Sequence, residues 1–246
     1  MEFRIVRLET TDSTMKAARR LPDAPSGTVV VAGSQTEGAG TKGRRWLSEH
    51  GGLYFTLVLR EKYAPGIMLH FNLLIASSVA SVLRSVDIAS ASVLWPNDVV
   101  CTGGKVAGVM AEGEVLHSVV DPLLVGVGLN VNNDISAIRK SGVWVSSLRE
   151  ETGRELSVDN LLEECLQGIG DALRDVDDQA AVLSRVRTVL QTGMPVEVES
   201  MHGVFDAVLG GITDDFLPVF RNGSSEMTLG RTEVTRIRPL RIRQQG

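Results

Sequence analysis

A glycine-rich, basic segment, residues 35–46 (QTEGAGTKGRRW), constrains this chain most because it cannot contribute to a hydrophobic core. It has no large apolar side chain before its closing tryptophan. Its glycines permit positive φ angles and close approach of the backbone to a ligand, and its cations favour an anion. The segment indicates either a site for a phosphate or acyl phosphate or a flexible basic surface loop. The glycines are Gly38, Gly40 and Gly43, and the cations are Lys42, Arg44 and Arg45.

Two apolar runs enclose this segment. Residues 28–32 are rich in β-branched side chains, and residues 53–59 (LYFTLVL) form a second such run. Both are typical of buried strands, so we expect a sheet to hold both ends of the loop. Residues 67–86 place apolar side chains at helical spacing, which predicts an amphipathic helix on one face of that sheet.

The first residues predict a strand followed by a short helix. Residues 3–10 alternate as in a strand, and residues 12–14 (DST) precede a helical stretch that stops at Pro22. Asp, Ser and Thr commonly cap helices. A helix N-terminus also offers free backbone N–H groups, so the DST residues suit both capping and the binding of a neutral polar ligand.

The middle of the chain reads as further strands and two helices. Residues 92–94 lead into a Trp-Pro-Asn-Asp tetrapeptide, and a hairpin turn is expected at Gly103 and Gly104. Residues 123–132 predict a buried strand whose interior glycines, Gly126 and Gly128, indicate close approach of another group. Ser157 is a candidate N-cap of one helix, and a second helix is expected over 177–191.

From Gly193 onward the pattern changes to short alternating pieces separated by turn residues. This pattern predicts a small all-β barrel, and we therefore expect two domains, residues 1–191 and 192–246. The basic run at 236–243 suits a solvated edge strand or a strip that binds a partner.

Composition excludes several classes of protein. Hydrophobic residues make up 43% of the chain and charged residues 22%, as in ordinary globular proteins. The net charge of −5 argues against a general nucleic-acid binder. Cys101 and Cys165 lie far apart without metal-ligand spacing, and the histidines are scattered, so no metal site is expected. We recognise neither an export signal nor a membrane-spanning apolar run, and we expect a cytoplasmic protein.

Five motifs, in their order along the chain, resemble the biotin–protein ligase family. In the repressor members of this family a DNA-binding helix-turn-helix precedes the catalytic domain. Because the first motif here begins at Asp12, which leaves no room for such a domain before it, the resemblance is to the monofunctional type. The resemblance covers essentially the whole chain. It implies an α/β (α+β) fold, with a mixed-sheet catalytic domain followed by a small SH3-like β barrel. The motifs are DST at 12–14, QTxGxGxxGRxW at 35–46, WPND at 95–98, GKVAGV at 104–109 and GVGLNVN at 126–132.

The family joins biotin to ATP, with magnesium, and then transfers the biotinyl group from the adenylate to a lysine of a carrier domain. Such chemistry needs cations beside the meeting anions, backbone donors and exclusion of water. The resemblance implies a biotin carrier domain as partner, with neither DNA nor membrane, and it is compatible with a homodimer.

The resemblance also assigns roles to particular residues. Lys105 and Arg44 are the candidate catalytic residues, and no residue is assigned to a metal. Lys105 in a Gly-Gly hairpin also suits an ordinary surface lysine, and Trp95 suits the core. The candidate biotin-binding residues are Ser13, Thr14, Gln35, Gly38, Gly40, Thr41 and Lys105, and the candidate nucleotide-binding residues are Arg44, Trp46, Asn97 and Asn130.

Two positions depart from the family pattern. Thr41 stands where the family has an arginine that helps to retain the adenylate, and Leu94 replaces a lysine before the WPND motif. Lys42 supplies charge but not the planar donor pair of arginine. The departures leave two alternatives open, a ligase for another carboxylic acid and a non-catalytic homologue that binds ligand. The signature of lipoate ligases, two arginines with a triple glycine, is not seen.

Overall fold

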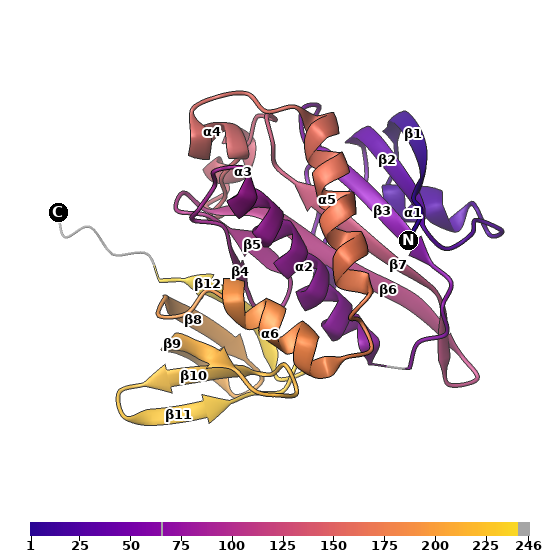
Figure 1. Ribbon diagram of the computed structural model, residues 1–246. Coiled ribbons are helices and arrows are strands. Elements are labelled where there is room, and N and C mark those ends of the chain that lie inside the picture. The colour runs from indigo at the N-terminus through magenta and orange to yellow at the C-terminus, as the bar shows by residue number, and fades with distance from the viewer. Residues whose placement is uncertain (65, 241–246) are drawn as a thin grey trace.

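The larger of two sheets carries the first part of the chain. The structure, a computed structural model, describes residues 1–64 and 66–240. In this mixed sheet, shown in Figure 1, the strands lie in the order β1-β2-β3-β7-β6-β5-β4 and only β1 and β2 pair in parallel. Its strands are β1 (Arg4–Thr11), β2 (Thr28–Gln35), β3 (Leu53–Leu59), β4 (Ser92–Leu94), β5 (Asp98–Val100), β6 (Lys105–Leu116) and β7 (Val119–Leu129).

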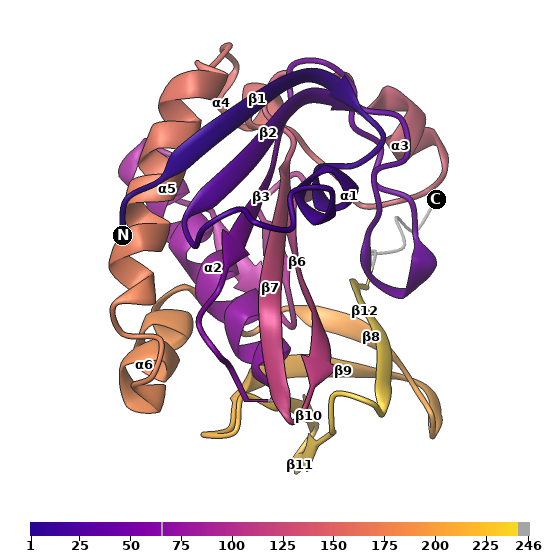
Figure 2. The ribbon, with the colours of Figure 1, turned by 90° about the vertical axis from the view of Figure 1, so that its right-hand side faces the viewer.

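Helices cover both faces of this sheet. The short helix α1 (Thr14–Arg19) packs against β2, β3 and β7 on one face, and Figure 2 shows it on the side opposite the long helices. The long helices α2 (Ile67–Ser85), α5 (Val158–Leu173) and α6 (Gln179–Val189) pack together on the other face. Three short elements were not predicted, the 3-10 turn Thr41–Gly43, α3 (Ser136–Lys140) and α4 (Leu148–Thr152).

Helix α2 is buried more completely than expected. Its predicted apolar stripe exists, but Asn72, Ser77 and Ser78 are buried as well, because α5 and α6 cover the side that faces away from the sheet. The helix is also apolar and long enough to cross a membrane by length and composition, which corrects our reading of the sequence. Since 67% of that stretch is buried inside the fold, it is typical of a core helix.

The second sheet forms a small antiparallel unit after α6, with strand order β11-β10-β9-β8-β12. The predicted combination of a mixed sheet and a small β unit is therefore confirmed. The expected division at 191/192 falls in the connection between α6 and β8, and we propose it as the domain boundary. The strands are β8 (Pro195–Ser200), β9 (Gly203–Ile212), β10 (Pro218–Asn222), β11 (Ser225–Thr228) and β12 (Val234–Pro239).

The two sheets are joined by buried contacts. Trp95, 2% exposed, donates a hydrogen bond of 2.8 Å from Nε1 to the carbonyl oxygen of Phe216. One continuous hydrophobic cluster contains core side chains of both units, and a smaller cluster lies under α1. The interpretation of Trp95 as a core residue is thus confirmed, and the small unit rests on the larger one.

Some of the predicted helix caps and strand positions are confirmed and others are wrong. Ser157 caps α5 as expected, since its side chain accepts from the Asn160 amide. Ser13 occupies the N-cap position of α1 but makes no side-chain capping bond, so the capping hypothesis is wrong for its hydroxyl. Strand β7 ends at Leu129, short of the predicted 132. Strand β12 lies at the edge of its sheet as expected, and residues 241–243 of the basic run lie outside the described residues.

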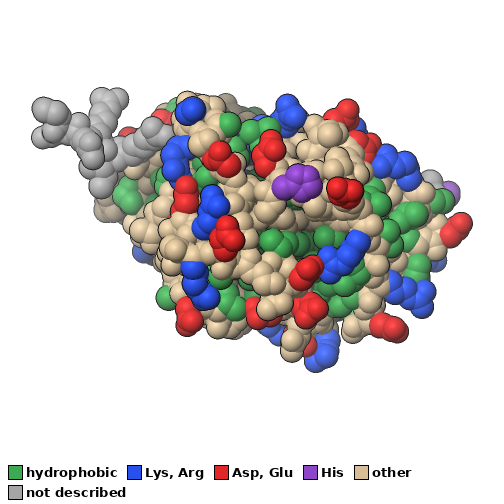
Figure 3. Space-filling view, turned by 90° about the horizontal axis from the view of Figure 1, so that it is seen from above, with side chains coloured by type: hydrophobic (Ala, Val, Ile, Leu, Met, Phe, Trp, Pro, Cys, Tyr) green, Lys and Arg blue, Asp and Glu red, His purple; other side chains and the backbone are tan. Residues whose placement is uncertain are grey.

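The surface seen from above in Figure 3 carries mixed charge. Lysine and arginine side chains lie interspersed with aspartate and glutamate on this face. Such a distribution accords with the acidic net charge of −5.

Candidate active site

One cavity collects nearly all of the predicted site residues. It has a volume of about 430 Å³ and lies against β6, β7, the start of α1 and the glycine-rich segment. Gly38 is the only predicted site residue that does not line it. The predicted residues that do are Ser13, Thr14, Gln35, Gly40, Thr41, Arg44, Trp46, Asn97, Lys105 and Asn130.

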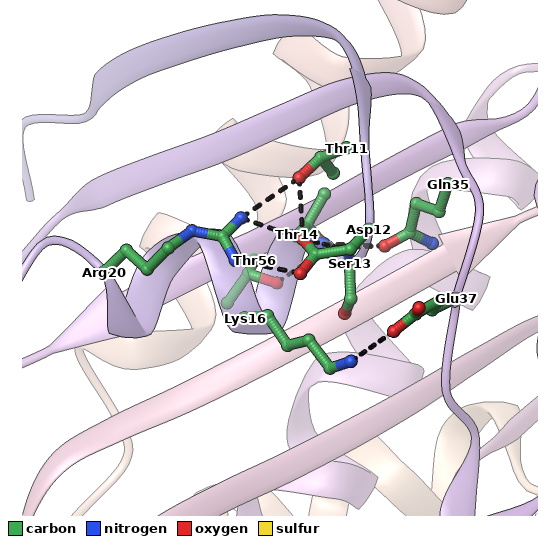
Figure 4. Close-up of polar contacts among 9 residues, drawn as sticks. All are labelled: Thr11, Asp12, Ser13, Thr14, Lys16, Arg20, Gln35, Glu37 and Thr56. Carbon is green, nitrogen blue, oxygen red and sulfur yellow. Dashed lines mark hydrogen bonds and ion pairs between the residues drawn. The ribbon is translucent and has the colours of Figure 1, made fainter.

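At one end of the cavity, hydrogen bonds fix the start of α1 to the end of β2. The parallel pairing of β1 with β2 places Thr11 opposite Gln35, which brings the first turn of α1 beside the Gln35 amide. Gln35 Oε1 accepts from the Thr14 backbone N–H at 2.8 Å and from its hydroxyl at 3.2 Å, and Thr56 donates to the same hydroxyl at 2.9 Å (Figure 4). Gln35 Nε2 donates to Ser48 Oγ at 2.8 Å. No motif pointed to Thr56 or Ser48, although both are buried.

The Ser13 hydroxyl is a polar group at this end that has no protein partner among the described residues. The Ser13 side chain is 2% exposed. Ser13 lines the cavity, so its hydroxyl is free to pair with a polar ligand there. Ser13 is therefore a candidate ligand contact.

Asp12 braces the turn and does not line the cavity. It accepts two hydrogen bonds of 2.8 Å from Arg20 and one of 2.7 Å from the Ser13 amide, as Figure 4 shows. The Arg20 guanidinium, and after it the Ser13 N–H, hold the pKa of Asp12 well below its usual range. Asp12 therefore stays charged and holds Ser13 in place.

The glycine-rich segment doubles back on itself at the other end. Gly40 N donates to Arg44 O at 2.7 Å, and Trp46 N donates to Gly38 O at 2.8 Å. Of its three glycines only Gly43 adopts the positive φ that glycine permits, 70°. Gly38 is required for another reason, because a Cβ there would lie 2.4 Å from the Trp46 carbonyl oxygen.

The cations of this segment contact neutral oxygen atoms. Arg44 donates to Thr41 O at 3.2 Å and to Thr41 Oγ1 at 3.0 Å, and Arg45 donates to Thr36 O at 3.0 Å. Lys42 donates to backbone carbonyls of β12. Within residues 1–64 and 66–240, none of these three cations forms an ion pair with a carboxylate. Arg44 and Arg45 line the cavity, so their positive charge is available to an anion there, whereas Lys42 does not line it.

Lys105 reaches the same cavity from the hairpin between β5 and β6. Its Nζ lies 2.6 Å from Asp98 Oδ1 and 5.1 Å from the centroid of the Trp46 ring. Its side chain is only 24% exposed, so the interpretation as an ordinary surface lysine is wrong. Asp98, though part of a recognised motif, was not expected as its partner.

The two asparagines are fixed through their amide nitrogens. Asn97 Nδ2 donates to Val109 O at 2.7 Å, and Asn130 Nδ2 donates to Ser146 O at 3.2 Å. The Asn97 side-chain oxygen has no hydrogen-bond partner in the described part of the chain, whereas that of Asn130 accepts from Asn133. Both asparagines thus shape the wall, and Asn97 keeps an acceptor free.

Glycines of β6 and β7 form the surface on which Trp46 lies. A Cβ on Gly128 would approach Trp46 Nε1 to 2.5 Å, and one on Gly108 would approach Trp46 Cζ3 to 3.1 Å. At Gly126 the neighbour is Met15, with Sδ 2.9 Å from such a Cβ. The predicted close approach to the β7 glycines is confirmed. Trp46 Nε1 is buried and has no partner within the described residues.

Two parts of the cavity wall were not predicted, because no sequence motif includes them. The first is the segment around α3, which contributes Ile138, Val143 and Val145, and the second is Arg236 of β12. Apolar residues after a strand occur in cores as well as in sites, and an arginine in an edge strand occurs on ordinary surfaces as well as in sites. Neither pattern therefore indicates a site. Leu94, one of the departures, is 3% exposed and belongs to the core, so this position has no room for a solvated cation.

The comparisons with known proteins agree with this geometry. The sequence profile of the Biotin/lipoate A/B protein ligase family matches residues 5–130, more than half of the chain. The chain belongs to this family.

Relatives in the family match the chain over most of its length. A biotin–[acetyl-CoA-carboxylase] ligase of Paracoccus denitrificans is 28% identical over 92% of this chain and 98% of its own. The bifunctional ligase/repressor BirA of Bacillus subtilis is 27% identical over 84% of this chain, which spans about two thirds (66%) of that protein. The solved biotin protein ligase of Aquifex aeolicus in complex with biotin and ATP superposes with a TM-score of 0.80 and 26% identity, covering 96% and 99% of the two chains.

Proposed function

We propose that this protein is an ATP-dependent biotin–protein ligase. It joins the biotin carboxylate to the α-phosphate of ATP, which releases pyrophosphate, and then passes the biotinyl group from AMP to a lysine of a biotin carrier domain. Family membership and the nearly full-length match to the Paracoccus denitrificans ligase support this proposal. The cytoplasm is the proposed location, which suits two free, buried cysteines.

The observation that carries the proposal is the layout of the cavity that holds the predicted site residues. Ser13, Thr14 and Gln35 offer hydroxyl and amide groups at one end, and Arg44 and Lys105 offer charge at the other. A ureido ring has one carbonyl and two N–H groups, and each group left unpaired on burial costs about 1–3 kcal/mol. The polar end pairs such groups, while the cationic end accommodates the carboxylate and phosphates.

Lys105 and Arg44 are the proposed catalytic residues. When a carboxylate attacks a phosphate, two anions must meet, and fixed cations lower the barrier by neutralising the charge that accumulates between them. In the transfer step, the lysine amine attacks the acyl carbon, the C–O bond to AMP breaks, and AMP leaves with the electron pair. Asn97 and Asn130 are proposed to contact the nucleotide, and Trp46 to cover the reacting groups and exclude water.

Magnesium belongs to the proposal only as a companion of ATP. Among the described residues, no group of three or more His, Cys, Asp or Glu side chains forms a metal site. Magnesium in such enzymes commonly binds substrate phosphates together with one or two carboxylates. We derive no step through the ion.

Release of pyrophosphate from ATP with different acids tests the proposal. The acids are biotin, lipoate and octanoate, and biotin is expected to give the fastest release. Biotin should also raise the melting temperature by mass action, and ATP with magnesium should raise it further as the adenylate forms.

Two alternatives are also tested, a ligase for another acid and a non-catalytic homologue, because Thr41 stands where the family has an arginine. Faster release with another acid would identify a ligase that has diverged in substrate. Stabilisation by biotin without pyrophosphate release would identify a non-catalytic binding homologue.

A further inference from the structure

The edge strand β12 contains an irregularity beside the cavity. Its pairing with β8 shifts register between Val234 and Arg236, so Thr235 is an extra residue in the ladder. In a regular strand residues 234 and 236 face one side and 237 the other. Here Val234 and Ile237 both pack into the core, while Arg236 lines the cavity. The bulge therefore turns Arg236 towards the site, a common use of β-bulges.

Lys42 binds to this bulge from the glycine-rich segment. Its Nζ donates to Val234 O at 3.0 Å and to Thr235 O at 2.7 Å. Successive carbonyls of a regular strand point in opposite directions, so one ammonium group reaches both only where the strand is irregular. The contact thus joins residues that are far apart in sequence and belong to the two β units.

The backbone of Lys42 is itself in an unfavourable conformation. Its φ of 59° and ψ of 38° lie in the left-handed region, which is unfavourable for a residue with a side chain. Burial lowers the pKa of Lys42, and the neighbouring charges of Arg44 and Arg231 act in the same direction. A residue held against strain and charge repulsion must be fixed by its contacts, and for Lys42 these are the two β12 carbonyls.

We propose that Lys42 is a positioning residue that fastens the Thr41–Gly43 turn to the β12 bulge, so that the C-terminal β unit holds the glycine-rich segment over the cavity. This inference rests on the proposed function. It assigns to Lys42 a task different from replacing the family arginine at Thr41, because the ammonium group is engaged with β12. The ATP side of the reaction then depends on the C-terminal unit, whereas the polar end at Ser13 and Thr14 does not.

Three substitutions at one position separate the ammonium group from the backbone. Lys42→Met removes the donor and keeps an unbranched side chain. Lys42→Gly removes the donor and relieves the left-handed conformation. Lys42→Arg keeps a cation that can donate to both carbonyls. Lys62→Met is the matched control, because Lys62 is exposed and has no hydrogen bond or ion pair to a described residue.

The first readout is hydrogen exchange in the whole protein without ligand, which does not depend on any activity. We expect Lys42→Met and Lys42→Gly to speed exchange across both residues 38–46 and residues 234–237, and Lys42→Arg and Lys62→Met to resemble the wild type. Unchanged exchange in Lys42→Met, or faster exchange in the glycine-rich segment alone, would overturn the proposed attachment.

The second readout is steady-state kinetics with biotin and ATP. Losing hydrogen bonds from a charged donor should raise the KM for ATP on the order of tenfold in both Lys42→Met and Lys42→Gly. The KM for biotin should stay close to that of the wild type, and Lys42→Arg should recover most of the loss. Equal changes in both KM values, or a change in kcat alone, would contradict a positioning role on the ATP side. If the wild type itself forms no adenylate, the proposed function fails while the exchange experiment still tests the attachment.

Discussion

The two ends of the cavity are built in different ways. At the polar end, Thr14, Gln35 and Thr56 are joined by hydrogen bonds within a buried network that includes the backbone. At the cationic end, Arg44 is exposed and bonds to Thr41 within its own turn. The first end keeps its shape through contacts with the central sheet, whereas the second lies on a loop that contacts strand β12 of the small β unit through Lys42.

This difference indicates a division of labour in binding. A ring with fixed hydrogen-bonding groups is best met by fixed partners, because pre-organisation reduces the entropy lost on binding. A triphosphate must enter, react and leave as pyrophosphate, which suits cations on a loop with freedom to rearrange. We therefore expect substitutions at the polar end to change biotin affinity and substitutions at the cationic end to change the chemical step.

The largest effect should come from Lys105→Ala. Removing a charged donor worth roughly 1.5–3 kcal/mol to the anionic transition state should slow pyrophosphate release by about one to two decades. Lys62→Ala is the control, and melting curves of both variants exclude loss of folding. Pyrophosphate release at the wild-type rate would show that Lys105 serves only its ion pair with Asp98.

The second largest effect is expected at the polar end of the cavity, from Thr14→Val. Thr14→Val keeps the shape of the side chain but removes the hydroxyl that donates to Gln35 and accepts from Thr56. Biotin affinity, measured by calorimetry, should fall about tenfold, while ATP affinity should stay the same. Thr10→Val is a matched control, since the Thr10 hydroxyl bonds to Ser34 in an exposed position. A loss of ATP affinity in Thr14→Val would mean that the two ends are not independent.

A smaller effect is expected at Thr41. An arginine there restores charged donors, which should strengthen the hold on the adenylate by about 1 kcal/mol, or roughly fivefold. Wild-type protein should therefore label lysines of a bystander protein more than Thr41→Arg does. Thr41→Ser keeps the hydroxyl and serves as control. If Thr41→Arg and wild type show equal bystander labelling and equal adenylate dissociation, the threonine at position 41 does not weaken retention of the adenylate.

The smallest effect concerns the hairpin that presents Lys105. Burial, and to a lesser degree Glu151, raises the pKa of Cys101 from 9.0 to about 11. Because the native state favours the neutral thiol, this contribution to stability is fully present below pH 9 and is lost as pH rises through 11.

Denaturant unfolding of wild type and Cys101→Ser between pH 8 and pH 11 measures this contribution. The wild type should lose stability more steeply, by at most about 1.4 kcal/mol per pH unit. Parallel curves for the two proteins would mean that Cys101 is not buried as described.

Regular patterns in the sequence were sufficient for the main strands and helix starts. The apolar run at 53–59 became β3, and the hydroxyl of Ser157 caps α5. The burial of α2 on its far side could not be predicted, because it depends on α5 and α6 packing there. Helices α3 and α4 are five residues each, too short to display a period.

The site was predictable where it is made of motifs and not where it depends on tertiary contacts. Glycines in β7 indicated a close approach, and Trp46 is the group that fills the space at Gly128. The position of Arg236 follows from one extra residue in an edge strand, which alternation alone cannot reveal. The partners of Lys42 are carbonyls of β12, almost 200 residues away in the sequence, so no local pattern specified them.

The way in which the cavity is assembled has a consequence for the order of events during synthesis. The strands of the larger sheet end at Leu129, whereas Arg236 of β12 contributes to the same cavity. Domains generally fold as units, with the N-terminal one first as the chain emerges from the ribosome. The polar end at Ser13 and Thr14 therefore becomes available early, but the cavity is complete only after β12 has been translated and has paired with β8. A nascent chain that stops before β12 would have a place for the ring of biotin and no finished place for ATP.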